Sequence, residues 1–258
     1  MMNATADWVP VAKVKVARNL TAADLRAALA AGWGDFKAFP AFGLAFAGIY
    51  VFAGLLIASV LFRGSAPFWL IPAAAGFPLL GPFVAVGLYE VSRRREQGLP
   101  MRWTAVFGAL RGRGDEQILS MGVIVFVAFA FWLMVAHGIF AVFLSDSGLG
   151  DDWMAALATP AGLAMLAIGS VVGAIMALAF YAITVISLPM LVDREVDFLT
   201  AIIVSLATVR SNGTVMIGWA AIVAAILFAA MLPLFLGLFV ALPVLGHATW
   251  HLYRRAVV

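Results

Sequence analysis

The chain of 258 residues contains no cysteine, which excludes disulfides, thiolate metal sites, thiolate-ligated haem and cysteine nucleophiles. Charged residues are also scarce, at 11% of the chain, whereas a typical soluble domain carries roughly a quarter. Hydrophobic residues reach 65%, and the mean hydropathy is +1.07. These proportions predict a membrane protein that crosses the bilayer several times.

The first 37 residues lack the short apolar core that a secretory signal peptide needs. Because Met1 to Lys37 is polar and charged, we expect the N-terminus to be retained. The net charge of +3 would be compatible with a nucleic-acid partner. On a membrane protein, however, an excess of basic residues usually reflects which loops are cytoplasmic and an attraction to anionic lipids. We therefore expect anionic lipid on the cytoplasmic side as a partner, and no nucleic acid.

Crossing a hydrocarbon core of about 30 Å takes about 20 apolar residues. Six stretches meet this length, at approximately residues 39–62, 67–91, 118–145, 159–191, 214–232 and 235–253. Pro233 supplies the turn between the last two. Lysine and arginine gather before the first span and in every second loop, so the positive-inside rule places both termini in the cytoplasm. Six spans satisfy this rule because they return Arg254 and Arg255 to the positive side.

Each odd-numbered span follows a segment in which apolar residues recur at helical spacing. The first begins at Thr21, which can cap a helix together with Asp24. The second follows Pro100 and the third follows Asp197. The expected apolar faces are Leu25, Leu29, Trp33 and Phe36 in the first segment, Trp103, Val106, Phe107 and Leu110 in the second, and Phe198, Ile202, Leu206 and Val209 in the third. This spacing predicts amphipathic helices on the cytoplasmic membrane surface.

The expected fold is therefore all-α. It is a polytopic membrane helix bundle with six transmembrane helices arranged as three hairpins, each preceded by an interfacial amphipathic helix. A cytoplasmic segment, 1–19, leads into one transmembrane domain, 20–258, built of three repeat-like units at about 20–99, 100–195 and 196–258.

The second predicted span is rich in helix-breaking residues. It contains Pro72, Pro78 and Pro82 together with Gly76 and Gly81. Several backbone hydrogen bonds of a regular helix must be missing there, so the span is bent or broken. Broken spans occur in transporter sites, and a facilitator or a transporter of lipids or small molecules is one alternative function.

Catalytic and ion-translocating chemistry has little support in the sequence. No charged residue lies near the middle of a predicted span, where an ion-coupled carrier would need one. No set of serine, histidine and acid is recognisable by spacing, and the chain has neither a phosphate-binding glycine loop with a lysine nor an H-E-x-x-H motif. We therefore expect no enzyme activity, no catalytic residues and no cofactor.

The final stretch, "LGHATWHLYRRAVV" (245–258), places His247 and His251 one helical turn apart on one face. This spacing suits a metal ion, for which the acids expected at the same membrane level are Glu90 and Asp193. The same spacing does not suit a haem with two histidine ligands, because its axial ligands must approach from opposite sides of the ring. Aromatic residues and arginines flank the pair, which favours an interfacial anchor. Metal or haem binding through the two histidines is the alternative.

Three segments carry a family resemblance: "GPFVAVGLYEVSRRREQG" (81–98), "PMLVDREVDFLTAIIVSLATVRSN" (189–212) and "GHATWHLYRR" (246–255). From about residue 20 onward the chain resembles the DUF2189 family of bacterial integral membrane proteins. The resemblance implies a multi-helix protein of the bacterial inner membrane, without assigning an activity. The family pattern marks, without a role, Gly81, Pro82, Tyr89, Glu90, Arg93, Pro189, Asp193, Arg194, Asp197, Ser205, Asn212, Gly246, Trp250, His251 and Tyr253.

Names of some family members link them to cytochrome c oxidase, so the resemblance also points to a respiratory oxidase as partner. A catalytic oxidase subunit needs at least about six histidines for its haems and copper, and this chain has three. The leading hypothesis is therefore a non-enzymatic accessory or scaffold protein, associated with a respiratory or other membrane complex.

Many of these motif positions fall at the cytoplasmic ends of the second, fourth and sixth spans. We expect them to form a polar collar that clamps the interfacial helices to the bundle. The predicted collar consists of Glu90, Arg93, Asp193, Arg194, Trp250, His251, Tyr253 and Arg254.

Overall fold

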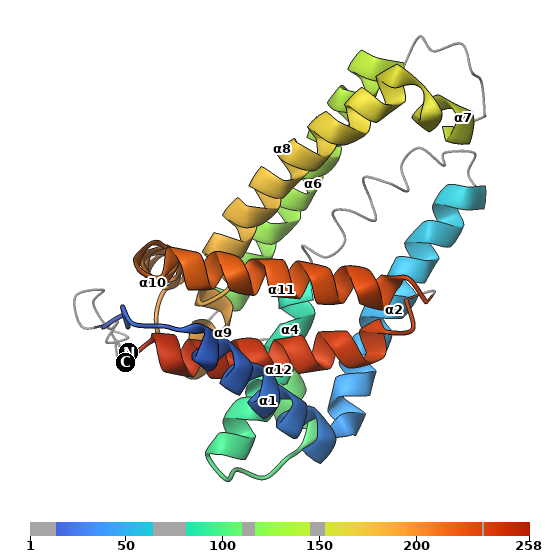
Figure 1. The fold of residues 1–258 in the computed structure, drawn as a ribbon. Helices are drawn as coiled ribbons and strands as arrows, with labels where there is room; N and C mark the ends of the chain where they lie inside the picture. Colours follow the sequence, from blue (N-terminus) through green and yellow to red (C-terminus); the bar gives the residue numbers. More distant parts are fainter. Residues whose placement is uncertain (1–13, 64–80, 110–116, 145–152, 234) are drawn as a thin grey trace, which may run out of the picture. The chain divides into compact units, whose positions relative to one another are not determined.

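The computed structural model describes residues 14–63, 81–109, 117–144, 153–233 and 235–258 (Figure 1). Within these ranges the regular elements are helices, and an isolated β-bridge joins Val16 to Val257. The helices are α1 (Ala22–Ala38), α2 (Pro40–Arg63), α4 (Gly81–Glu96), α5 (Trp103–Gly108), α6 (Gln117–Leu144), α7 (Trp153–Ala158), α8 (Pro160–Thr184), α9 (Ser187–Asp193), α10 (Phe198–Ser211), α11 (Gly213–Met231) and α12 (Leu238–Ala256). The expected all-α fold class is confirmed.

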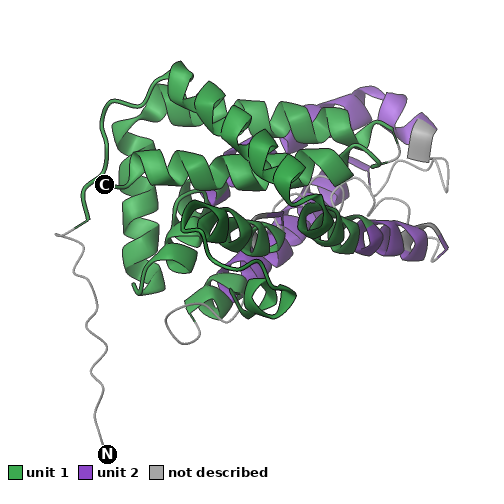
Figure 2. Ribbon diagram, turned by 90° about the horizontal axis from the view of Figure 1, so that it is seen from below, with its two compact units in different colours: residues 1–51, 82–122, 181–258 green, residues 52–81, 123–180 purple. Residues whose placement is uncertain are grey.

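Two compact units form within the chain (Figure 2). Unit 1 contains Met1–Val51, Pro82–Gly122 and Tyr181–Val258, and unit 2 contains Phe52–Gly81 and Val123–Phe180. In unit 2, a Cβ added to Gly173 of α8 would lie 2.9 Å from the Trp132 ring of α6, so the glycine lets the two helices approach closely. The expected division into a cytoplasmic segment, one transmembrane domain and three repeat units stays a prediction.

Four of the described helical stretches are long and apolar enough to cross a membrane, judged by length and composition. They are Pro40–Val60, Gln117–Leu144, Pro160–Asp193 and Gly213–Met231. They coincide with the first, third, fourth and fifth expected spans. The prolines and glycine expected to break the second span at 72, 76 and 78 lie outside the described residues. The sixth expected span corresponds to α12, which is not among the four, so the six-span arrangement stays a prediction.

The fourth expected span is two helices, because Pro189 interrupts it. Proline has no N–H and is tolerated in the first turn of a helix, so the chain breaks after α8 and starts again as α9. Ser205 of α10 supplies the missing partners: its Oγ accepts from the Ile186 N–H at 3.2 Å and donates to the Ala182 carbonyl at 2.7 Å. Pro189 and Ser205 were both motif positions without a role, and the structure connects them.

The apolar centre of unit 1 joins α2, α4 and α5. Phe42 and Phe46 of α2 pack with Leu88 and Val91 of α4 and with Val106 of α5. Each of these side chains is almost fully buried. The packing places α4, which carries several of the polar motif positions, against α2 and α5.

Helix α1 begins where the sequence predicted, and the face that it buries overlaps only in part with the expected apolar face. Asp24 accepts hydrogen bonds from the N–H and the hydroxyl of Thr21, as expected of a capping pair. Trp33, which was expected on the apolar face, is 44% exposed. The buried residues are Leu25, Ala28, Gly32, Asp35 and Phe36. Small residues and one acid therefore join Leu25 and Phe36 on the face towards the rest of unit 1, and Trp33 lies outside that face.

Gly32 permits the contact between α1 and α12. A Cβ built on Gly32 would lie 2.6 Å from the backbone nitrogen of Ala248 and 2.6 Å from the carbonyl oxygen of Val244. Backbone atoms cannot rotate away as the end of a side chain can. The two helices can approach this closely only because the residue at position 32 has no side chain.

The two ends of the described chain are hydrogen-bonded to each other. The N–H of Val258 donates to the carbonyl of Lys15 at 2.9 Å. Asn212, between α10 and α11, donates from Nδ2 to the Ala17 carbonyl at 2.7 Å and accepts from the Leu20 N–H at 3.1 Å. The segment before α1 is thus fixed both to the C-terminus and to the junction of α10 and α11.

We predict that Gly32→Ala lowers the thermal unfolding temperature of the protein in detergent, because overpacking of a tight contact typically costs about 1–3 kcal/mol. Gly34→Ala is the matched control, since its Cβ would meet only the Arg95 guanidinium at an ordinary 3.6 Å. That control should be neutral or stabilising, because alanine favours helix over glycine by up to about 1 kcal/mol. Equal unfolding temperatures for the two variants would contradict the close contact.

Candidate functional site

One polar group in the described part of unit 1 surrounds the buried acid Asp35. We call Asp35, Ser92, Arg95, His247 and His251 the Asp35 cluster. Asp35 lies on α1 and is 3% exposed, yet its carboxylate accepts from Ser92 Oγ at 2.6 Å, from His251 Nε2 at 2.9 Å and from Arg95 Nη1. Since the donors come from α4 and α12, one carboxylate binds three helices together.

The direction of the hydrogen bonds in this cluster follows from counting protons. Ser92 has a single hydroxyl proton, which it donates to Asp35. The 2.7 Å contact between Ser92 Oγ and His247 Nδ1 therefore has His247 as donor. The neutral ring then carries its proton on Nδ1, and its buried Nε2 has no hydrogen-bond partner among the described residues. His247 is held by Ser92 rather than activating it.

Hydrogen bonding overcomes burial in setting the charge of Asp35. Burial alone would raise the pKa of this carboxyl, but the hydrogen bonds that it accepts from His251 and Ser92 outweigh burial and lower the pKa to about 2. Asp35 is therefore ionised at neutral pH. A buried carboxylate is tolerated in a protein interior when it is bound by several donors in this way.

The Asp35 cluster contains a serine, a histidine and an acid, but not in the order of a hydrolase. In a catalytic triad the histidine accepts the proton of the serine and the acid orients the histidine. Here Ser92 stands between Asp35 and His247, and it is 1% exposed. The arrangement fixes helix positions and provides no activated nucleophile at a surface.

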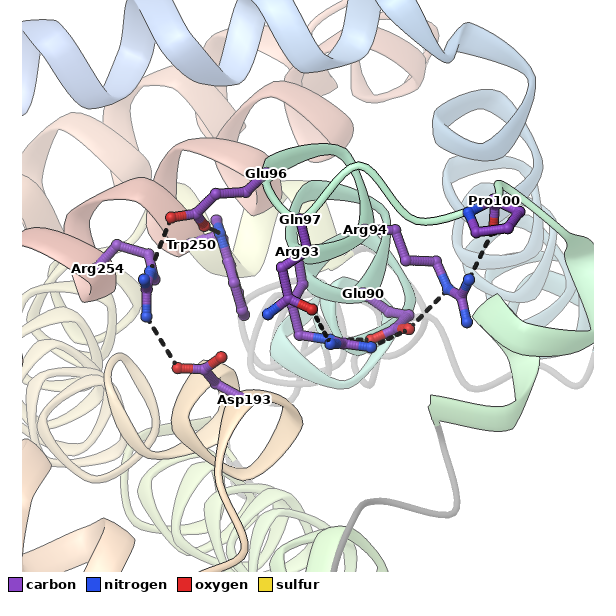
Figure 3. Close-up of polar contacts among 9 residues, drawn as sticks. All are labelled: Glu90, Arg93, Arg94, Glu96, Gln97, Pro100, Asp193, Trp250 and Arg254. Atoms are coloured by element: carbon purple, nitrogen blue, oxygen red, sulfur yellow. Dashed lines mark hydrogen bonds and ion pairs between the residues drawn. The ribbon is translucent and has the colours of Figure 1, made fainter.

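A second group, the Glu90 cluster, closes the end of α4 (Figure 3). Glu90 is bound twice by Arg93, at 2.6 and 2.7 Å, and once by Arg94, at 2.8 Å. The two arginines also reach onward, Arg93 to the Gln97 side chain and Arg94 to the Pro100 carbonyl. The cluster thus holds the turn that leaves α4 towards α5.

A third group, the Asp193 cluster, joins the C-terminal ends of α4, α9 and α12 (Figure 3). Asp193 accepts from the Tyr253 hydroxyl at 2.7 Å and from Arg254 Nη1 at 3.1 Å. Glu96 accepts from Trp250 Nε1 and from Arg254 Nε, each at 3.1 Å. Arg254 lies between the two acids and is shared by them, so the cluster locks α12 to both neighbours.

The residues of the predicted collar all lie in unit 1, divided among these three clusters. Glu90 and Arg93 belong to the Glu90 cluster. Asp193, Trp250, Tyr253 and Arg254 belong to the Asp193 cluster, where Arg194 Nε also lies 3.8 Å from Asp193. His251 belongs to the Asp35 cluster. Their proposed action as a clamp stays a prediction.

The residues considered for a metal ion are not brought together. Glu90 is bound by arginines, Asp193 by Tyr253 and Arg254, and the two histidines lie beside Asp35 instead. Within the described ranges, no three histidine, aspartate or glutamate side chains are arranged to hold a metal ion. The expectation that Glu90 and Asp193 are the acids at the level of the histidines missed Asp35.

Sequence reasoning also missed Ser92, Arg95 and Glu96. The signal for Asp35 lay in the spacing of Ala28, Gly32 and Asp35, which puts two small residues and an acid on one face of α1. Small residues mark a close helix contact, and an acid on such a face needs donors from the facing helix. The larger side chains of Trp33 and Leu29 instead indicated the neighbouring face of α1 as the apolar one.

We predict that Asp35→Ala lowers the stability of the detergent-solubilised protein by about 3 kcal/mol, because Ser92, Arg95 and His251 lose their shared acceptor. Thermal unfolding followed by circular dichroism would measure the change. Glu195→Ala removes an exposed acid and serves as the control, with little expected effect. An unfolding temperature unchanged by Asp35→Ala would show that the cluster does not hold the helices.

The pH dependence gives a separate test of Asp35. Its folded-state pKa of about 2 lies below the unfolded value of 3.8, so its stabilisation is complete above pH 3.8 and is lost as the pH falls towards 2. The loss is at most about 1.4 kcal/mol per pH unit. Asp35→Asn does not titrate, so the difference in unfolding temperature between the two proteins should shrink from about pH 5 to about pH 2. A constant difference would contradict the lowered pKa.

Comparison with known proteins places the chain in a family. No curated protein and no solved structure matches it. The family model described as a predicted integral membrane protein, DUF2189, matches residues 70–193. This range is narrower than the resemblance seen from about residue 20, but it contains the acids of the Glu90 and Asp193 clusters. The chain is therefore a multi-pass integral membrane protein whose residues 70–193 match the DUF2189 family.

Proposed function

We propose that the protein is a non-enzymatic accessory or scaffold protein of a bacterial inner membrane, associated with a respiratory or other membrane complex. The observation that carries this proposal is how the buried ionisable groups are used. The acids of the three clusters are bound by arginine, histidine, serine, tyrosine or tryptophan donors from the chain itself. These groups act in holding helix ends together, and none of the three clusters offers an acid or base to a substrate.

The proposed topology has both termini in the cytoplasm and six spans arranged as three hairpins. The hydrogen bond from Val258 to Lys15 supports an even number of spans, because two ends that bind each other lie on one side of the membrane. The positive-inside rule favours the cytoplasmic side, since most of the arginines and lysines belong to segments on that side.

The collar supports a scaffold role because it fixes the surface that a partner would meet. Arg254 is shared by Asp193 and Glu96, and about 40% of its side chain is exposed. The ends of α4, α9 and α12 therefore form a polar surface whose geometry is fixed by ion pairs between these helices. A rigid polar surface at the ends of membrane helices suits association with another membrane protein.

We predict that the protein, purified gently from its native membrane, migrates on a native gel as an assembly larger than its own detergent complex. A constant set of membrane proteins should be recovered at fixed stoichiometry. Asp193→Ala should weaken this assembly, because it releases Tyr253 and Arg254, whereas Glu195→Ala, two residues away and exposed, should not. Mass spectrometry with cross-linking would identify the contacting residues.

Migration of the wild-type protein alone, under conditions that keep other membrane complexes intact, would overturn the scaffold proposal. Solute flux through liposomes containing only the purified protein would also overturn it in favour of a transporter. Because these measurements use the wild-type chain, they remain decisive even where Asp193→Ala fails to fold.

A further inference from the structure

Helix α10 connects two candidate spans at one side of the membrane. The stretch Pro160–Asp193 ends five residues before α10, and the stretch Gly213–Met231 begins two residues after it. A chain that leaves the bilayer at one position and re-enters at the other must run along the surface between them. The 14 residues of α10 make up most of this connection.

The faces of α10 are reversed relative to a helix on a soluble protein. The side that packs into unit 1 is mostly polar or small, with one valine, and it comprises Thr200, Ala201, Val204, Ser205 and Thr208. The outward side carries Leu199, Ile203 and Leu206, which are 58%, 50% and 44% exposed. A row of exposed aliphatic residues beside two membrane spans is what contact with lipid acyl chains requires.

Two cations accompany this apolar row at the C-terminal end of α10. Arg210 belongs to the last turn, and Arg18 lies in the segment that Asn212 binds through Ala17 and Leu20. Both arginines are exposed, and no ion pair within the described ranges involves either one. By contrast, Arg95, Arg254 and Arg255 are each paired with an acid. Arg18 and Arg210 are thus left to attract an anion beside the apolar row.

We propose that α10 is inserted in the plane of the membrane surface, and that Arg18 and Arg210 bind the headgroup of an anionic phospholipid whose acyl chains cover Leu199, Ile203 and Leu206. This inference rests on the proposed topology for its side of the membrane, because the cytoplasmic leaflet carries the anionic lipids. The combination of an aliphatic row and neighbouring guanidinium groups fits a lipid, which presents phosphate and acyl chain together.

The first experiment measures depth, and the absence of cysteine makes site-specific labelling straightforward. A nitroxide is attached at Leu206→Cys, on the outward face, or at Glu195→Cys, which is exposed just before α10. In nanodiscs, the label at position 206 should collide more with oxygen than with a water-soluble nickel chelate, and the label at position 195 should show the reverse. Equal access of the nickel chelate to both labels would overturn the insertion of α10.

The second experiment measures headgroup binding by native mass spectrometry of the purified full chain with added phosphatidylglycerol or phosphatidylcholine. Each arginine near an anionic headgroup contributes about 1 kcal/mol, so Arg18→Gln and Arg210→Gln should each lower the affinity for phosphatidylglycerol about fivefold. The matched control is Arg26→Gln with Lys37→Gln, which removes two cations from α1. That control should keep the preference for the anionic lipid.

An equal loss of affinity in the control would show non-specific attraction and overturn the site. Full displacement of phosphatidylglycerol by inorganic phosphate would likewise overturn the assignment to a lipid. Both experiments use the isolated protein with defined lipids, so they can succeed or fail whether or not a protein partner exists.

Discussion

The carboxylate of Asp35 is the constraint on which the arrangement of unit 1 depends. A negative charge that is almost fully buried has to be surrounded by donors, and here they come from α4 and α12 while the acid itself is on α1. The three helices must therefore approach one another closely. Gly32, three residues earlier on the same face, removes the side chain that would keep α1 and α12 apart. The Asp35 carboxylate requires donors from α4 and α12, and Gly32 leaves the space for α12 to approach α1.

The Asp193 cluster extends this arrangement along two of the helices that Asp35 brings together. On α4, one turn beyond Ser92, Glu96 reaches Trp250 and Arg254 of α12. Arg254 then carries the connection to Asp193 at the end of α9. The Asp35 and Asp193 clusters thus share helices α4 and α12 and together involve α1, α4, α9 and α12. A change at Asp35 is expected to reach helices that it does not touch, because α4 and α12 carry donors or acceptors of both clusters.

Sequence reasoning located elements better than it located faces, and the reason is the membrane. Capping residues and breaks are local, so the start of α1 at Thr21 and the turn at Pro233 followed from the sequence. The sequence assigned Trp33 and Leu206 to apolar faces on the membrane surface, and both side chains are exposed in the structure, but it did not identify the faces by which α1 and α10 pack on the rest of the protein. Beside lipid, apolar side chains have no need to be buried in protein. Helix contacts are then made by small and polar residues, whose spacing on α1 and α10 was the signal to follow.

The break at Pro189 shows why α10 has to present a polar face to the protein. Separating α8 from α9 leaves the Ile186 N–H and the Ala182 carbonyl without helical partners, and Ser205 satisfies both. A leucine at position 205 could not do so, and an unpaired backbone group in this apolar setting is costly. The inward face of α10 is therefore fixed by the hydrogen-bonding needs of the neighbouring span. Leu199, Ile203 and Leu206 lie on the outward face, and in a membrane protein an outward aliphatic face is suited to contact with lipid.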